Sequence, residues 1–151
     1  MSSHKTAISR KGPSAPLKLL LGKESLKSPI LDYGCGRGAD SKHLSALSYD
    51  VSSYDPYWSP INIDDKDGAY NTIICNYVLN VVEKLEEEDI LKDIKRLLSK
   101  NGVAYLAVRR DIKKEGVTTK GLQRNVTLNL PKLYEKKGSF CIYKLKKKAY
   151  D

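Results

Sequence analysis

Residues 30–38 read Ile-Leu-Asp-Tyr-Gly-Cys-Gly-Arg-Gly, a short apolar stretch that breaks into three glycines at alternate positions. This pattern predicts a strand that ends in a tight loop, because glycine adopts positive φ and lets the backbone come close to a ligand. A helical pattern follows over residues 39–47, and its N-terminus would direct free N–H groups towards the loop. A second predicted strand, residues 51–54, ends at Asp55-Pro56. An acid at this place can take the two hydroxyls of a ribose, so the unit predicts a site for a nucleoside-bearing cofactor.

Two families of cofactor are compatible with this unit. A dinucleotide fingerprint requires Gly-x-Gly-x-x-Gly/Ala and an acid about twenty residues further on. Gly34, Gly36 and Ala39 fit that frame, so NAD stays an alternative. However, Asp32 stands two residues before the first glycine. A pyrophosphate gains nothing from a carboxylate there, whereas a cofactor that ends in an ammonium group and a sulfonium does.

The acid followed by Gly-x-Gly-x-Gly resembles the first motif of the class I S-adenosylmethionine-dependent methyltransferases. The resemblance implies that Asp32 and the glycine loop hold the methionine end of S-adenosylmethionine, and that Asp55 binds the ribose. An acidic or polar residue near the third strand of the family would meet the adenine, and Asp64 is the best candidate. The cofactor residues implied in this way are Asp32, Gly34, Cys35, Gly36, Gly38, Asp55, Pro56, Asp64 and Asn76.

The same resemblance indicates catalytic residues at the ends of two later strands. In the family, residues after the fourth strand face the transferred methyl group, which here selects Asn76 and Tyr77. Arg109 and Arg110 follow the fifth predicted strand, and arginine can grip a phosphate bidentately. No base is visible in the sequence, and the spacing of the cysteines and histidines predicts no metal site.

The predicted fold is α/β, a Rossmann-like class I methyltransferase fold. We expect a three-layer sandwich with a mostly parallel sheet and a C-terminal antiparallel strand pair, residues 125–130 and 139–146. The fold should be reduced around the third strand, because residues 58–69 leave room only for a short strand at 61–63. An apolar stripe predicts a helix over residues 83–100, with Asn101-Gly102 as its C-terminal cap.

The length of 151 residues suits one domain with a core of its own. We divide residues 1–151 into a basic N-terminal segment (1–28), a cofactor-binding core (29–108) and a basic substrate-side part (109–151). The first holds six Lys/Arg against one acid, the second eight against thirteen, and the third thirteen against four. Basic ends around an acidic core would favour a polyanion, so we expect nucleic acid as a partner. A lysine-rich solubilising surface is the alternative.

A narrower resemblance connects the sequence with DNA. Residues 31–38 together with 55–57 are similar to the putative methyltransferases associated with DNA phosphorothioation systems, as are residues 6–10 and 16–17. Those proteins are larger and have a long C-terminal part that this sequence lacks.

Three rival functions remain open from the sequence: a binding module for S-adenosylmethionine that acts with a partner protein, a small-molecule methyltransferase, and a nicotinamide enzyme. Three cysteines at expected strand positions suggest reduced thiols and a cytoplasmic protein. We also expect no membrane association, and the sequence does not predict the oligomeric state.

Overall fold

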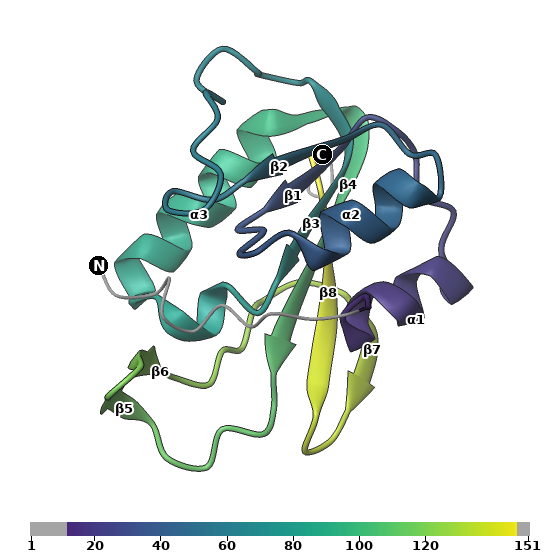
Figure 1. Cartoon of the computed structure of the whole chain (residues 1–151). Helices are drawn as coiled ribbons and strands as arrows, with labels where there is room; N and C mark the ends of the chain where they lie inside the picture. Colours follow the sequence, from purple (N-terminus) through teal and green to yellow (C-terminus); the bar gives the residue numbers. More distant parts are fainter. Residues whose placement is uncertain (1–11, 148–151) are drawn as a thin grey trace.

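The computed structural model describes residues 12–147, which form three α-helices, a short 3-10 helix and eight strands (Figure 1). The helices are α1 (Ala15–Lys23), α2 (Ala39–Ala46), η2 (Leu79–Val81) and α3 (Lys84–Leu97). The strands of the main sheet are β1 (Ile30–Tyr33), β2 (Val51–Tyr54), β3 (Tyr70–Asn76), β4 (Leu98–Arg109), β7 (Lys132–Lys136) and β8 (Phe140–Lys146). A separate hairpin consists of β5 (Gly116–Thr118) and β6 (Gly121–Gln123).

The main sheet has the strand order β2-β1-β3-β4-β8-β7. The first four strands are parallel, and β8 then pairs antiparallel with both β4 and β7. The chain order reverses between β1 and β3, and ligands of open α/β sheets bind at such a switch point, outside the carboxyl ends of the strands. The predicted mostly parallel sheet with a C-terminal antiparallel pair is confirmed.

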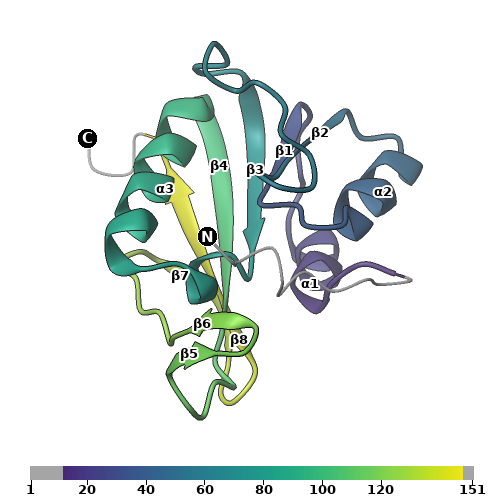
Figure 2. The same cartoon turned by 60° about the vertical axis from the view of Figure 1, so that its left-hand side comes forward.

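Helices cover both faces of the sheet, which makes three layers (Figure 2). Helices α1 and α2 lie on one face, where Leu17, Leu20 and Leu44 pack in one buried apolar cluster. Helix α3 lies on the other face, where Ile94 and Leu97 belong to the second cluster. Alternate positions of the strands supply the two clusters, so both faces of the parallel sheet are buried.

The reduction around the third strand is also confirmed. Residues 55–69, all of them described, contain no helix or strand, and only an isolated bridge joins Asp55 to Ser59. The short strand expected at residues 61–63 is therefore wrong: Ile63 is instead buried against the α3 side of the core. Strand β2 consequently forms one edge of the sheet.

The end of α3 differs from the prediction. The helix stops at Leu97, and Asn101-Gly102 lies inside β4 rather than capping the helix. Leu98 has extended backbone angles, and the Lys147 Nζ donates hydrogen bonds to the carbonyls of Arg96 and Leu98 (3.3 and 2.7 Å). Carbonyls at the helix end are thus satisfied by a distant side chain.

The strand expected at residues 125–130 is wrong as well. This segment pairs with no strand, although Val126 and Leu128 are buried in the α3-side core. Its alternating apolar residues therefore cover the sheet instead of extending it. The antiparallel partner of β8 is β7, a few residues further along the chain.

Candidate functional site

A cavity of about 1160 Å³ opens at the carboxyl ends of the parallel strands. The glycine loop between β1 and α2, the turn after β2, the segment after β3 and the exposed side of α3 all contribute to its wall. Most of the predicted cofactor residues line it, namely Asp32, Gly34, Cys35, Gly36, Gly38, Asp55, Pro56 and Asn76. Tyr77 and Arg109 line it too.

The glycine loop has the backbone that its sequence predicts. Gly34, Gly36 and Gly38 all have positive φ, between 55° and 86°. A Cβ built on Gly34 would come 2.4 Å from the Val78 Cγ2, so any side chain at this position would force Val78 or the loop to move. Gly38 begins α2 without any side-chain cap, which leaves the first-turn N–H groups of the helix at the loop.

Asp55 holds the glycine loop in place. Its Oδ2 accepts a hydrogen bond from the Gly36 N–H (3.0 Å), and its Oδ1 accepts from the N–H groups of Tyr57 and Trp58 (2.9 and 3.0 Å). Because each carboxylate oxygen has two lone pairs, Oδ2 keeps capacity for a further donor. The carboxylate thus shapes the loop and can also receive a ligand hydroxyl.

Asp32 is a buried acid in β1. Its side chain is 3% exposed, and its Oδ2 accepts a hydrogen bond from the Ser41 hydroxyl (2.7 Å). Burial raises the pKa of this carboxyl from 3.8 to about 7; the Ser41 hydrogen bond opposes the shift, and the charges of Asp40 and Asp55 add to it. A cation bound in the cavity would favour the ionised form.

The pH dependence of stability tests this environment. The folded-state pKa of Asp32 lies above the unfolded value, so the stabilisation is present at low pH and is lost as the pH rises from 3.8 to about 7. Relative to Asp32→Asn, the free energy of unfolding of the wild type should fall by about 3 kcal/mol between about pH 5 and about pH 8. Urea unfolding of both proteins at the two pH values measures this difference. Parallel pH profiles would contradict the raised pKa.

Asp40, in the first turn of α2, connects three elements at the cavity wall. It accepts hydrogen bonds from the backbone N–H and the hydroxyl of Ser14 (2.7 Å each) and from the Asn76 Nδ2 (3.0 Å). The buried Oδ1 of Asn76 has no hydrogen-bond partner among the described residues. Since buried acceptors are almost always paired, with protein, ordered water or a ligand, this atom marks a place for a donor from outside the protein. Sequence reasoning missed Asp40 and Ser14; the acid just after the glycine loop was the available signal.

Tyr77 follows β3 with a φ of 65°, a conformation that is strained for an aromatic residue. Its N–H donates to the Ala107 carbonyl (2.9 Å), which fixes the backbone at the cavity wall. Strain of this kind gathers at binding and catalytic sites, so the observation is compatible with the predicted role of Tyr77.

Two of the predicted site residues, Asp64 and Arg110, and the nearby Arg124 do not line the cavity. Asp64 is exposed and does not line the cavity. Arg110 points away from it, bonding the Val126 carbonyl, the Tyr143 hydroxyl and Glu135. Arg124, beside Gln123, pairs instead with the buried Glu87 (2.7 Å). The structure therefore does not bring Asp64 or Arg110 to the other predicted residues.

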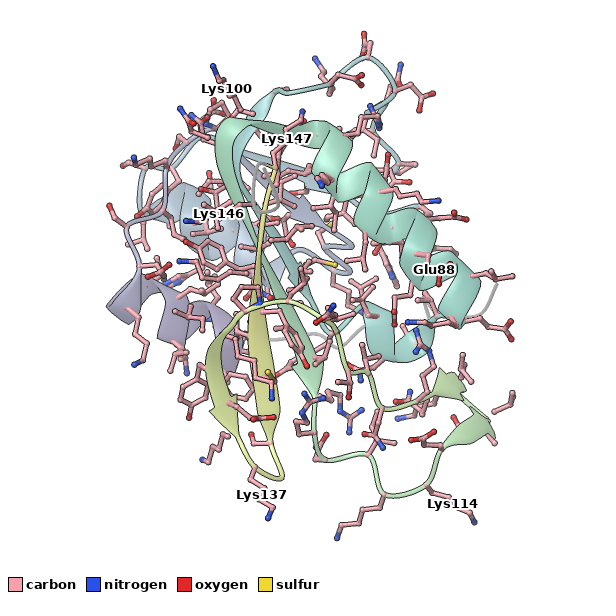
Figure 3. The ribbon with its side chains drawn as sticks, turned by 180° about the vertical axis from the view of Figure 1, so that it is seen from behind. Glu88, Lys100, Lys114, Lys137, Lys146 and Lys147 are labelled. Carbon is pink, nitrogen blue, oxygen red and sulfur yellow. The ribbon has the colours of Figure 1, made fainter. Side chains whose placement is uncertain are left out.

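Positive and negative side chains are not divided simply between the basic ends and the acidic core that the sequence indicates. Seven carboxylates and four cationic side chains line the cavity. Lys100, Lys146 and Lys147 lie at one end of the molecule, whereas Lys114 and Lys137 lie at the other (Figure 3). The labelled lysines of the C-terminal part, Lys114, Lys137, Lys146 and Lys147, are therefore spread over both ends of the molecule. Residues 1–11 and 148–151, which carry part of the predicted basic ends, lie outside the described residues.

The sheet order, the glycine loop and the cavity at the switch point define a Rossmann-like class I methyltransferase fold. A family described as "Methyltransferase domain" matches residues 7–134, more than half of the sequence. The chain therefore belongs to this family of methyltransferase enzymes. No curated protein matches the sequence.

Solved structures share the fold at low sequence identity. The PH0226 protein from Pyrococcus horikoshii OT3 is similar with a TM-score of 0.64 and 14% identity, over 84% of this chain and 85% of that one. The 1,6-didemethyltoxoflavin-N1-methyltransferase of Burkholderia thailandensis, solved with S-adenosylhomocysteine, has a TM-score of 0.61 and 16% identity, over 86% and 74%.

A third structure comes from work on the conversion of a disulfide bond into a thioacetal group during echinomycin biosynthesis. Its TM-score is 0.59 at 19% identity, over 66% of this chain and 52% of that chain. This chain thus spans about half the length of that protein. At these identities the likeness shows the fold alone.

Two further findings concern residues 12–147. No helix among them is long and apolar enough to cross a membrane. Their histidine, cysteine and carboxylate side chains form no cluster of three or more that could hold a metal ion. The three cysteines at positions 35, 75 and 141 are free thiols, and burial raises the pKa of Cys35 to about 12.

Proposed function

We propose that the protein is an S-adenosylmethionine-dependent methyltransferase that acts on nucleic acid or another anionic acceptor. The observation that carries the cofactor assignment is the buried, unpaired Oδ1 of Asn76 beside Asp40, in the wall of a cavity that Asp32 also lines. An ammonium group would give this acceptor the donor that it lacks, next to carboxylates that balance its charge. A nicotinamide dinucleotide has no cation suited to such a group of acceptors.

The remaining predicted residues fit the rest of that cofactor. The N–H groups at the start of α2 and the close backbone of the glycine loop suit its carboxylate. Asp55, with a free lone pair on Oδ2, suits a ribose hydroxyl. When bound, S-adenosylmethionine supplies an activated methyl group on a sulfonium.

The residues around the cavity would contribute mainly alignment and exclusion of water. Asn76 ends β3 and Tyr77 follows it, whereas Arg109 ends β4. All three line the cavity, so they can position an acceptor. The carboxyl groups of Asp32 and Asp40 favour a cationic group at this end of the cavity, and a bound cation would in turn favour the ionised form of Asp32. Because no base is evident at the site, methylation of an acceptor nitrogen that is already nucleophilic is easier than methylation of a hydroxyl.

The acceptor class rests on charge and on resemblance. Arg109 at the cavity and the excess of lysine and arginine in residues 109–151 support an anionic acceptor. The resemblance of residues 31–38 and 55–57 to putative methyltransferases of DNA phosphorothioation systems makes DNA the first nucleic acid to test.

Calorimetric titration with S-adenosylmethionine, S-adenosylhomocysteine and NAD tests the cofactor. The first two should bind, and Asp55→Ala should weaken their binding by about ten- to one-hundred-fold, because a charge-assisted ligand contact and the anchor of the loop are both lost. Asp50→Ala is the matched control: Asp50 is exposed and precedes β2, at the end of the strand away from the cavity. It should bind like the wild type.

Other outcomes would separate the rival functions. Binding of NAD alone would overturn the proposal. Binding of S-adenosylmethionine without methyl transfer to DNA, RNA or small anionic acceptors would favour a cofactor-binding module that acts with a partner. The absence of helix and strand in residues 55–69 is the feature that favours this second function.

A further inference from the structure

A second, smaller pocket adjoins the cavity on its β4 side. Its volume is about 310 Å³, and it shares Arg109, Asp111 and Gln123 with the cavity. The charged residues that line it are Arg109, Asp111, Lys113, Lys114 and Lys120. Four of these are cationic and one is acidic. The small pocket thus has a positive charge excess, whereas the adjoining cavity has an excess of carboxylates.

The segment that forms this pocket is held in a defined shape. Strands β5 and β6 pair antiparallel, and the Thr118 hydroxyl closes their turn by donating to the Gly121 carbonyl (2.8 Å). Two hydrogen bonds hold the base of the hairpin to the fully buried Asn80. The Arg124 N–H donates to the Asn80 carbonyl, and the Asn80 Nδ2 donates to the Arg124 carbonyl (2.9 Å each). The Asn125 Nδ2 donates a hydrogen bond to the Glu115 carboxylate (2.8 Å), so this acid at the start of the hairpin is bound to the residue that follows Arg124.

Arg109 stands where the two pockets meet. Its backbone N–H donates to the Asn80 Oδ1 (2.7 Å), so the position of this residue is fixed by a buried group. Its Nε donates to Asp111 (2.8 Å) and its Nη1 to Gln123 (3.3 Å). Within residues 12–147, the Nη2 group makes no hydrogen bond, so two of the five guanidinium hydrogens are available for an anion.

The neighbouring lysines are also available. None of the ion pairs among residues 12–147 involves Lys113, Lys114 or Lys120, and all three side chains are exposed. Asp111, the acid of the pocket, is already paired with Arg109, which lowers its pKa and keeps it ionised. Three lysines without an ion-pair partner among residues 12–147 and one guanidinium with two free N–H hydrogens therefore belong to the wall of a small, open depression that has room for a single phosphate group.

We propose that this pocket binds a phosphate group of the methyl acceptor, and thereby places the rest of the acceptor in the cavity. The inference rests on the proposed function and adds the chemical group by which the acceptor is recognised. The difference in charge explains why the two ligands would bind at different places. A cationic cofactor is attracted to the carboxylate-rich cavity, and an anionic group is attracted to the lysine-rich pocket beside it. The phosphate can belong to a nucleic-acid strand or to a small phosphorylated molecule.

Binding of thymidine 5′-monophosphate and of thymidine, each titrated into protein saturated with S-adenosylhomocysteine, tests the proposal. We expect the monophosphate to bind more tightly, and the Lys113→Gln/Lys120→Gln variant to lower its affinity about ten-fold, since each lost charge contact weakens binding by a few-fold. Lys100→Gln/Lys146→Gln removes the same charge at the far end of the molecule (Figure 3) and should leave the affinity unchanged.

Equal binding of thymidine and its monophosphate, or equal losses in the two double variants, would overturn the proposal, because either result means that no localised phosphate site exists. A short oligothymidylate identifies the source: binding tighter than the monophosphate, and lost with Lys113 and Lys120, indicates a nucleic-acid phosphate, while binding no tighter indicates a small phosphorylated acceptor. Failure of S-adenosylhomocysteine to bind while the monophosphate preference persists would overturn only the cofactor assignment. Melting temperatures of both variants control for folding.

Discussion

Replacing Gly34 with alanine should lower the free energy of unfolding by about 2–4 kcal/mol and abolish binding of S-adenosylhomocysteine. The φ of Gly34 is +77°, which is strained for any residue with a Cβ. The new methyl group would also come 2.4 Å from the Val78 Cγ2, far inside van der Waals contact. Either Val78 or the loop must move, and both line the cavity. Urea unfolding and calorimetric titration measure the two effects.

Gly38→Ala is the matched control for this prediction. Gly38 lies in the same loop with a φ of +86°, but a Cβ there meets nothing within 4 Å. Only the backbone strain remains, about 1 kcal/mol. Adding Val78→Ala to Gly34→Ala should recover part of the lost stability by removing the clash. Equal destabilisation by the two single variants would show that the contact with Val78 is unimportant.

The first part of the site could be predicted because its signals are local. The strand, glycines, helix and acid between residues 30 and 55 follow one another along the chain, and each glycine has the positive φ that its position requires. The sequence also predicts strand β3, the amphipathic helix α3 and the reduced third-strand region. The spacing of apolar residues and the length of each segment indicate these features directly.

The parts that were mispredicted depend on distant partners. Lys147 satisfies carbonyls at the end of α3, so no nearby glycine cap is needed. Residues 125–130 alternate like a strand, yet the place beside β8 is taken by β7. In both cases the local pattern was compatible with two structures, and tertiary contacts selected one.

The candidate site shows the same limit. Asp40 was not singled out from the sequence, because its importance comes from Ser14, which caps α1, and from Asn76, which ends β3. Arg109 is the last residue of β4 and Arg110 follows it, and adjacent side chains of an extended chain point in opposite directions. Arg109 lines the cavity, whereas Arg110 donates a hydrogen bond to the Tyr143 hydroxyl. A count of charges along the sequence does not reveal this difference.

Replacing Arg124 with methionine should lower the free energy of unfolding by about 3 kcal/mol, because it leaves a charge buried without its main partner. The Glu87 side chain is 1% exposed and is held by the Arg124 Nη2 and by the Lys84 Nζ (2.7 Å each). Lys84 is largely exposed, so it can offset the loss only in part. Chemical denaturation of the variant measures the change.

The substitution should also weaken the phosphate site, because Arg124 holds the base of the β5–β6 hairpin. Its Nε donates to the Val82 carbonyl, and its backbone pairs with Asn80, the residue that fixes Arg109. Lys132→Met is the control: its partner Glu135 is 40% exposed, so breaking this ion pair should leave the free energy of unfolding close to the wild-type value. Glu87→Gln combined with Arg124→Met should recover much of the loss, since no buried charge remains. If the double variant is as unstable as Arg124→Met alone, the packing of the arginine stem, and not the unpaired carboxylate, is the source of the destabilisation.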